Sequence, residues 1–354
     1  MNWNFIIFSA VKIAVVIGVV QGMVAYAVLA ERKISAWIQD RVGPNRAAPP
    51  LARFIPVLGS FLKRGGFFQP MADGVKFILK EDFTPAGVRK VYFWLAPAIV
   101  VIPAMLTVAV IPFGSQIGHQ PMVIADLNVG ILYTFGIVSL GVYGIMLAGY
   151  ASNSKYPFLG GIRSGAQMIS YEIAMGLSVI PVFLIAGDLN LSRLIGWQAQ
   201  HGWLVRYTPV SFVIFLIAAF AETNRLPFDF PEAEQELAGG YHLEYSSMKF
   251  ALFFLGEYSN MIASSAMMVT LFFGGWTLPW FGLDQPAATL GAGLAHIGVF
   301  IVKLLMFMVL FIWVRWMWPR FRYDQLMDLG WRRFLPIALA NILVTAVWLW
   351  WRTK

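Results

Sequence analysis

The chain has 354 residues, of which 59% are hydrophobic and 12% are charged, against roughly 25% charged residues in an average soluble domain. With a mean hydropathy of +0.69, this composition indicates an integral membrane protein, so the net charge of +8 is not taken as a sign of nucleic-acid binding. The chain has no Cys and four His, which excludes disulfides, thiolate metal sites and Cys-held iron–sulfur clusters and argues against a haem or metal site.

Eight apolar stretches approach the roughly 20 residues that a helix needs to cross the hydrocarbon of a bilayer. The fifth is the shortest and ends at Glu222. The first lacks the basic start and small-residue cleavage site of a signal peptide, so we expect it to remain as a span. The sequence therefore predicts an all-α polytopic protein, a single integral membrane domain over residues 1–354, with eight transmembrane helices at about 4–30, 93–113, 130–150, 166–186, 209–222, 249–275, 295–316 and 335–351.

The positions of Lys and Arg predict the orientation. Twenty of the 26 lie in the connections after the first, third, fifth and seventh spans or, as Lys249 and Arg315, at the span ends beside them. Four lie on the opposite face, and Lys12 and Lys303 lie deeper inside spans. Cytoplasmic connections carry the excess of Lys and Arg. We therefore expect both termini to be periplasmic and the cytoplasmic connections to be 31–92, 151–165, 223–248 and 317–334.

The first cytoplasmic connection interleaves apolar and basic residues, which is typical of amphipathic helices on a membrane surface. One such helix is expected at residues 51–62. An alternative for any single cation here is that it only binds anionic lipid headgroups. A second connection contains Gly160-Gly161-Ile162-Arg163-Ser164-Gly165, which lacks the strand-to-helix context of a nucleotide site and is interpreted as a tight turn.

The stretch from Glu222 to Tyr245 contains six acids, which are Glu222, Asp229, Glu232, Glu234, Glu236 and Glu244, and one cation, Arg225. A carboxylate beside hydrocarbon either finds a partner or takes up a proton, so this stretch is a candidate for proton handling. An alternative is a cytoplasmic helix that begins at Pro231, with Glu232 and Glu234 at its positive end. That alternative does not explain Asp229 and Glu236.

Charged residues also lie inside the predicted spans. Glu172 and Lys303 are flanked by apolar residues on both sides, where a charge costs on the order of 2.5–3.5 kcal/mol, so we favour a functional role for both. If Glu172, Glu222 and Lys303 face one interior, they form a proton relay. For Glu257 a structural hydrogen bond to a Ser or Tyr hydroxyl is an equal alternative. Lys12 is interpreted as reaching the outer surface.

Five segments of the chain, taken in order, resemble one family. They are ERKISAWIQDRVGPNR (31–46), QPMADGVKFILKEDFTP (69–85), SKYPFLGGIRSGAQMISYEIAMGLS (154–178), PFDFPEAEQELAGGYHLEYSSMKFALFFLGEY (227–258) and PRFRYDQLMDLGWRRFLPIALAN (319–341). They are similar to the H subunit of bacterial NADH:quinone oxidoreductase, respiratory complex I, equivalent to subunit 1 of the mitochondrial enzyme. One departure is the segment between Arg46 and Gln69, which is longer than is usual in that family.

The resemblance implies a subunit with eight transmembrane helices and no redox centre of its own, which forms the chamber that admits the quinone headgroup. By the same resemblance, the chamber wall would include Glu31, Arg32, Arg41 and Asp73. The acidic loop that lines the chamber would include Arg225, Asp229, Glu232, Glu234 and Glu236. Glu172 and Glu222 would begin a buried proton path, to which we add Glu257 and Lys303.

The implied substrate is ubiquinone or menaquinone, with NADH, flavin and iron–sulfur clusters on partner subunits. The partners would be the peripheral quinone-site and iron–sulfur subunits, small membrane subunits and antiporter-like subunits, in the inner membrane of a bacterium. Two alternatives remain open. One is the related membrane subunit of a hydrogenase. The other is an independent ion transporter, which would transport ions when purified alone.

Overall fold

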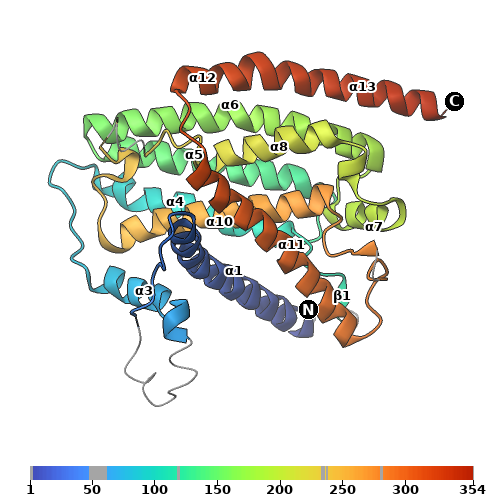
Figure 1. Cartoon of the computed structure of the whole chain (residues 1–354), viewed down its shortest axis with the longest axis horizontal. Coiled ribbons are helices and arrows are strands. Elements are labelled where there is room, and N and C mark those ends of the chain that lie inside the picture. Colours follow the sequence, from blue (N-terminus) through green and yellow to red (C-terminus); the bar gives the residue numbers. More distant parts are fainter. Residues whose placement is uncertain are drawn as a thin grey trace.

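Long helices dominate the computed structural model, which describes residues 3–47, 62–117, 120–232, 236, 238–279 and 282–353. Figure 1 shows these helices running side by side, with α13 along one edge next to α6. The long apolar helices are α1 (Trp3–Ile38), α4 (Lys90–Thr107), α5 (Gly130–Ala151), α6 (Lys155–Ala186), α8 (Pro209–Glu222), α10 (Ser247–Phe272), α11 (Leu290–Met317) and α13 (Leu335–Thr353).

Shorter elements connect them. The α-helical ones are α3 (Gln69–Leu79), α7 (Leu191–His201) and α12 (Tyr323–Asp328). The described residues also include three 3₁₀ turns, η2 (Val108–Val110), η3 (Leu204–Arg206) and η4 (Gly240–His242), and a π-helical turn, η6 (Leu329–Phe334). Two short strands, β1 (Gln116–Ile117) and β2 (Gln120–Pro121), pair antiparallel with Gln116 opposite Pro121.

The chain is thus a mostly helical, polytopic membrane protein. Within the described residues, six helical stretches are long and apolar enough to cross a bilayer: Ile6–Ile38, Lys90–Val110, Gly130–Ala151, Lys155–Ala186, Leu290–Met317 and Tyr323–Arg352. Two other predicted spans coincide with α8, which has 14 residues, and with α10, which carries Lys249 and Glu257. The number of eight crossings and the periplasmic termini stay predictions.

The predicted tight turn at 160–165 is wrong, because these residues lie inside α6. Their glycines serve close packing instead. A Cβ atom on Gly160 would lie 2.9 Å from the carbonyl oxygen of Pro231, and one on Gly165 would lie 2.7 Å from the Met146 sulfur of α5. A helix can contain glycine at a modest cost when its packing requires a side chain to be absent. The motif therefore lets α6 approach α5 and the acidic loop.

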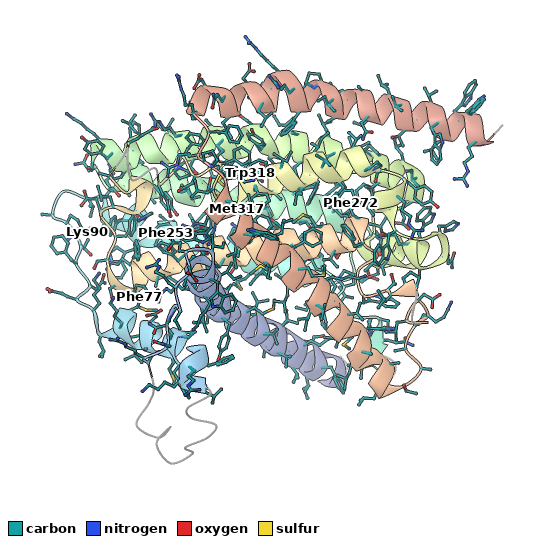
Figure 2. The ribbon with its side chains drawn as sticks, in the orientation of Figure 1. Phe77, Lys90, Phe253, Phe272, Met317 and Trp318 are labelled. Carbon is teal, nitrogen blue, oxygen red and sulfur yellow. The ribbon has the colours of Figure 1, made fainter. Side chains whose placement is uncertain are left out.

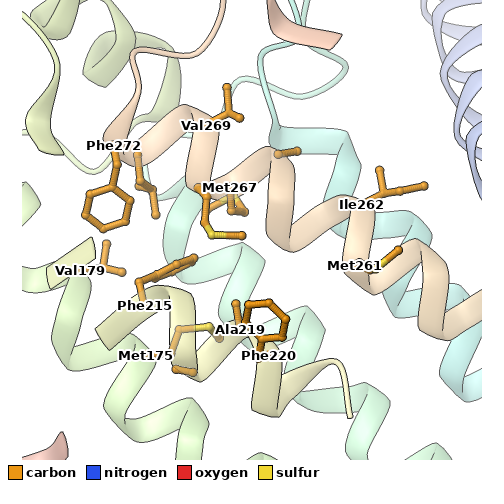
Figure 3. Packing of buried hydrophobic residues seen from close by; sticks show 14 of the residues in the cluster. Met175, Val179, Phe215, Ala219, Phe220, Met261, Ile262, Met267, Val269 and Phe272 are labelled. Atoms are coloured by element: carbon orange, nitrogen blue, oxygen red, sulfur yellow. The ribbon is translucent and has the colours of Figure 1, made fainter. Parts of the chain in front are cut away.

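The largest apolar core joins α6, α8 and α10 (Figure 3). Met175 and Val179 of α6 face Phe215 of α8, whose ring lies 5.6 Å from that of Phe272 of α10 between centroids. The ring of Phe220 packs at a tilt against that of Phe311 of α11, with centroids 4.2 Å apart. This packing buries the last turn of α8 and with it the carboxyl group of Glu222.

The described part of the first connection includes α3, which lies beside α1 and α10. Its exposed apolar side chains are Met71, Val75, Ile78 and Leu79, which share one face at helical spacing. Gln69, Asp73 and Phe77 point to the other side, where they line a cavity. The amphipathic helix predicted at 51–62 lies, but for Leu62, outside the described residues.

Candidate functional site

Arg225 is the centre of a buried ion network. Its side chain is 3% exposed, and it follows the end of α8. Its Nη1 donates to Glu31 Oε2 at 2.8 Å, and its Nε lies 2.6 Å from Glu257 Oε1 as an ion pair without hydrogen-bond alignment. The guanidinium also lies over the ring of Tyr258, 4.2 Å from its centroid. One cation therefore joins a carboxylate of α1 to a carboxylate of α10.

Glu31 is held by two further side chains. The hydroxyl of Tyr258 donates to Glu31 Oε2 at 2.6 Å, and Arg315 of α11 pairs with Glu31 Oε1. A buried charge is costly unless an opposite charge lies beside it. The network thus requires α1, α10, α11 and the loop after α8 to meet at one place.

The loop after α8 is attached to the segment between α11 and α12. Arg320 Nη2 donates to Asp229 Oδ2 at 3.1 Å, and the backbone N–H of Phe321 donates to the carbonyl of Pro227 at 3.2 Å. The rings of Phe228 and Phe321 stack with centroids 5.5 Å apart. These contacts keep the acidic loop next to the ion network.

A cavity of about 510 Å³ lies on one side of the network, between α1, α3, α10 and α11. Its polar wall includes Glu31, Tyr258 and Arg315, and its other walls are mainly apolar and aromatic. Phe77, labelled in Figure 2, contributes from α3 and contacts Phe250 with ring centroids 6.4 Å apart. Apolar walls with a few convergent polar groups are typical of sites for small organic ligands.

At the rim of this cavity, Arg32 Nη1 donates to Asp73 Oδ2 at 2.7 Å. The amide of Gln69 donates to the other oxygen of Asp73 at 3.0 Å. These bonds tie α3 to the end of α1.

A second, much smaller cavity of about 20 Å³ lies on the other side of the network. Three carboxyl groups line it, from Glu222, Glu232 and Glu257, together with Asn224 and Asn260. Its volume exceeds the roughly 10–15 Å³ needed to hold one water molecule. Glu222 is 2% exposed, and neither of its carboxyl oxygens has a hydrogen-bond partner within the described part of the chain.

The protonation equilibria of the acidic loop are shifted. Burial raises the pKa of Glu232 well above its usual range, and the negative charges of Glu257 and Asp229 raise it further. Burial also raises the pKa of Asp229, against the opposing effect of Arg320. Burial lowers the pKa of His242 to about 4, and its Nδ1 lies 3.7 Å from Glu232 Oε1. The loop therefore holds acids with raised pKa values beside a histidine with a lowered pKa.

The structure brings most of the predicted chamber residues together. Glu31, Arg32 and Asp73 line the larger cavity, and Arg225, Asp229 and Glu232 lie beside or behind it. Others lie apart: Glu236 pairs with Arg163 at 2.7 Å on the surface, and the exposed Arg41 contacts Gln39. Glu234 lies outside the described residues.

The predicted proton-path residues divide into two places. Glu222 and Glu257 share the small cavity, and Glu172 lies on α6, which packs against α8. Lys303 is elsewhere: its Nζ donates to the carbonyls of Phe273, Gly275 and Thr277 just after α10, at 2.7, 3.0 and 2.6 Å. The contacts of Lys303 are thus those of a helix C-terminal cation, and its membership in the proton path stays a prediction.

Sequence reasoning missed Arg315, Arg320 and Tyr258, which complete the ion network. The Arg residues were counted only for orientation, although an Arg at the end of a span can turn inward toward a buried carboxylate. Glu31 on an apolar helix was the available signal, because a buried acid requires such a partner.

Together the fold and the site define a class: a polytopic helical membrane protein that keeps a carboxylate and guanidinium network inside its bundle, next to a cavity suited to an organic ligand. Among the described residues, no group of three or more His, Asp or Glu is arranged to hold a metal ion. The chain belongs to the NADH dehydrogenase family, whose model matches residues 11–346, and within it to the H subunits of NADH-quinone oxidoreductase.

Bacterial relatives match nearly the whole chain. The NADH-quinone oxidoreductase H subunit 1 of Geobacter metallireducens is 50% identical over 339 residues, covering 94% of each chain. The corresponding H subunit 1 of Cytophaga hutchinsonii is 45% identical over 349 residues, covering 97% of this chain and 96% of the relative. NADH-quinone oxidoreductase subunit 8 of Rhodothermus marinus is 49% identical over 330 residues, covering 90% and 91%. The chain is thus a membrane subunit of an oxidoreductase complex.

Proposed function

We propose that this chain forms the quinone-binding chamber of NADH-quinone oxidoreductase and couples quinone reduction to proton translocation. The observation that carries the proposal is the position of Arg225. It binds Glu31 in the wall of the larger cavity and Glu257 in the wall of the smaller one. One guanidinium thus connects a site for an organic ligand to a set of buried acids.

The larger cavity has the chemistry that a quinone requires. A quinone headgroup offers two carbonyl oxygens as hydrogen-bond acceptors, and its ring and isoprenoid tail are apolar. Arg315 supplies N–H donors on one wall, while Val24, Val28 and Phe254 are among the apolar lining residues. The fold places this cavity next to α3, whose exposed apolar face suits contact with lipid, from which ubiquinone or menaquinone would enter.

Reduction of one quinone to quinol takes two electrons and two protons. The electrons originate from NADH and pass through flavin and iron–sulfur clusters on partner subunits, so this chain needs no redox centre of its own. Its contribution is electrostatic. Negative charge or proton demand at the quinone would weaken the hold of Arg225 on Glu31 or Glu257 and change the proton affinity of Glu232 and Asp229.

We propose that this change passes through Glu222 and Glu172 toward antiporter-like subunits, where protons cross the membrane. Coupling of this kind needs groups whose charge states bias one another, and Glu222, Glu232 and Glu257 share one small cavity. In this proposal the chain is a single integral domain with eight crossings in a bacterial inner membrane. Peripheral quinone-site and iron–sulfur subunits cover its cytoplasmic face.

Affinity purification of the tagged chain from its native membrane in mild detergent tests the assignment. We expect flavin and iron–sulfur subunits to co-purify, with inhibitor-sensitive reduction of quinone by NADH. Co-purification with a hydrogenase, or ion transport by the chain purified alone, would overturn the quinone assignment.

Proton coupling is tested separately with Glu222→Gln and Glu172→Gln in the assembled enzyme. We expect electron transfer from NADH to quinone with less proton pumping, because Gln cannot ionise. Glu81→Gln, at an exposed position of the first connection, is the control and should pump normally. Full pumping in both variants would contradict the proposed proton relay, and only the proposed quinone chamber would be retained.

A further inference from the structure

We propose that Gln167 is the positioning residue that holds Arg225 in place, an inference that rests on the proposed function of Arg225. Gln167 lies on α6 and is fully buried. Its Nε2 lies 2.8 Å from the carbonyl oxygen of Ala221, 2.7 Å from that of Phe228 and 3.3 Å from Asn224 Oδ1. One amide group therefore bonds to the chain before and after Arg225.

The segment between these two carbonyls is a tight reversal. Asn224 has a positive φ of 51°, the N–H of Arg225 donates to Phe220 O at 3.3 Å, and the N–H of Phe228 donates to Arg225 O at 2.8 Å. A positive φ is uncommon for a residue other than Gly and costs free energy unless the surroundings hold it. The side chain of Gln167 bridges the open side of this reversal.

This bridge determines where the guanidinium lies. Arg225 must reach Glu31 on α1 and Glu257 on α10 at once, and its backbone is anchored to α6 through the two ends of the reversal. Asp229 follows Phe228 directly, so the same anchor also positions the carboxylate that pairs with Arg320. A small shift of the loop would separate the guanidinium from one of its two carboxylates.

The chain offers a matched control at the other end of the bundle. Gln198 of α7 is also buried, and its Nε2 donates to Thr270 O at 2.9 Å while its Oε1 accepts from the N–H groups of Leu204 and Gly274. Both glutamines thus join helices through backbone bonds, but only Gln167 contacts the loop that carries Arg225. Loss of Gln198 reports the general effect of removing a buried amide.

The experiment compares Gln167→Met, Gln167→Glu and Gln198→Met in the assembled enzyme. The measurements are hydrogen exchange of the peptide covering residues 223–232 and the kinetics of NADH-driven reduction of a short-chain quinone. We expect both Gln167 variants to show faster exchange in this peptide and a quinone KM raised about tenfold. Electron transfer from NADH to ferricyanide, which bypasses the chamber, should be unchanged. Gln198→Met should leave the peptide and the quinone KM as in the native enzyme.

Gln167→Glu matches glutamine in size but turns carboxylate oxygens toward three acceptors, so it remains informative if Gln167→Met does not assemble. Gln167→His, which keeps an N–H donor, should restore part of the slow exchange. Native-like exchange of residues 223–232 in both Gln167→Met and Gln167→Glu would overturn the inference. Arg225→Lys separates the two proposals: if it leaves the quinone KM unchanged, the proposed function fails. If it raises the KM while the Gln167 variants do not, the positioning role fails.

Discussion

At the scale of single residues, the network depends on a cation that serves two acids. Arg225 donates to Glu31 through Nη1 and approaches Glu257 through Nε, so two nitrogens of one planar guanidinium serve the two acids, whereas a lysine has a single amine nitrogen. Tyr258 and Arg315 complete the surroundings of Glu31. Removing one member of such a buried set leaves an uncompensated charge, which is more costly than removing the whole set.

Replacing Arg225 tests this arrangement. We expect Arg225→Met to destabilise the folded subunit by about 3–5 kcal/mol, because Glu31 and Glu257 lose their shared partner. Thermal unfolding and assembly of the complex, followed by native gel electrophoresis, measure this loss. Arg193→Met removes the exposed pair with Asp188 and should have little effect on either measurement. Equal behaviour of the two variants would contradict a structural role for the network.

Glu232 leads to a prediction about pH. Burial raises its pKa above an ordinary value near 4.5, so its stabilising contribution is complete below that pH and is lost as the pH rises through the raised pKa. His242 acts oppositely, since its pKa is lowered to about 4 from 6.5 and its contribution is complete above pH 6.5. The melting temperature of the enzyme should therefore fall as the pH rises above 6.5, and Glu232→Gln should make this fall less steep. Glu81→Gln should keep the native slope, and an unchanged slope in Glu232→Gln would contradict the prediction.

At the scale of elements, the ends of helices carry the functional and structural charges. Glu222 lies in the last turn of α8 and Arg225 follows that helix, and both side chains are buried. The carbonyl groups just after α10 accept hydrogen bonds from the amine of Lys303. The Lys303 amine also lies 4.8 Å from the centroid of the Trp203 ring. A cation at the C-terminal end of a helix is stabilised by the helix dipole and by the unpaired carbonyl groups there.

Lys303→Met distinguishes this structural role from the predicted role in the proton path. The carbonyl contacts lead us to expect a loss of about 2 kcal/mol of stability, since hydrogen bonds to charged groups contribute about 1.5–3 kcal/mol. Proton pumping per electron, measured on the fraction that assembles, should be unchanged if the role is structural. A stable Lys303→Met enzyme with reduced pumping would instead support the proton path. Lys12→Met removes hydrogen bonds to Pro121 O and Val123 O, away from α10 and α11. It is the comparison for the effect on stability and proton pumping of losing a different lysine inside a predicted span.

At the scale of the whole molecule, the two ends of the helix bundle carry different features. In Figure 1 the N-terminus, β1, α7 and the C-terminus lie toward one end of the bundle, and α3 lies toward the other. The cavities described above lie near α3, the start of α10 and the end of α11. The excess of Lys and Arg predicts that this end is cytoplasmic.

The lack of cysteine makes this orientation directly measurable. A single Cys introduced as Glu81→Cys should react with an impermeant maleimide only in inside-out vesicles, because the first connection is predicted to be cytoplasmic. Gln200→Cys, at an exposed position of α7, should react only in right-side-out cells or vesicles. Labelling of both positions from one side would overturn the predicted topology.

The helical class and the family were predictable from the sequence because they depend on local patterns, whereas the roles of the individual chamber residues stay predictions. Apolar stretches of membrane length specify helices, and an acid such as Glu31 or Glu222 beside hydrocarbon signals function wherever its partner lies. The glycines at 160–165 were misread for the same reason. The sequence shows that Gly160 has no side chain. It does not show that the carbonyl oxygen of Pro231 lies so close that a side chain there would not fit.

Tertiary structure alone decided which charges meet. Glu31, Arg225, Glu257 and Arg315 lie on different elements, and their pairing depends on the faces that the helices present to one another. It also separated Lys303 from these acids and placed Gln167 against the loop. Burial makes these distinctions large, because in a poorly solvated interior a charge has few possible partners and a shift of a few ångströms decides whether it has one.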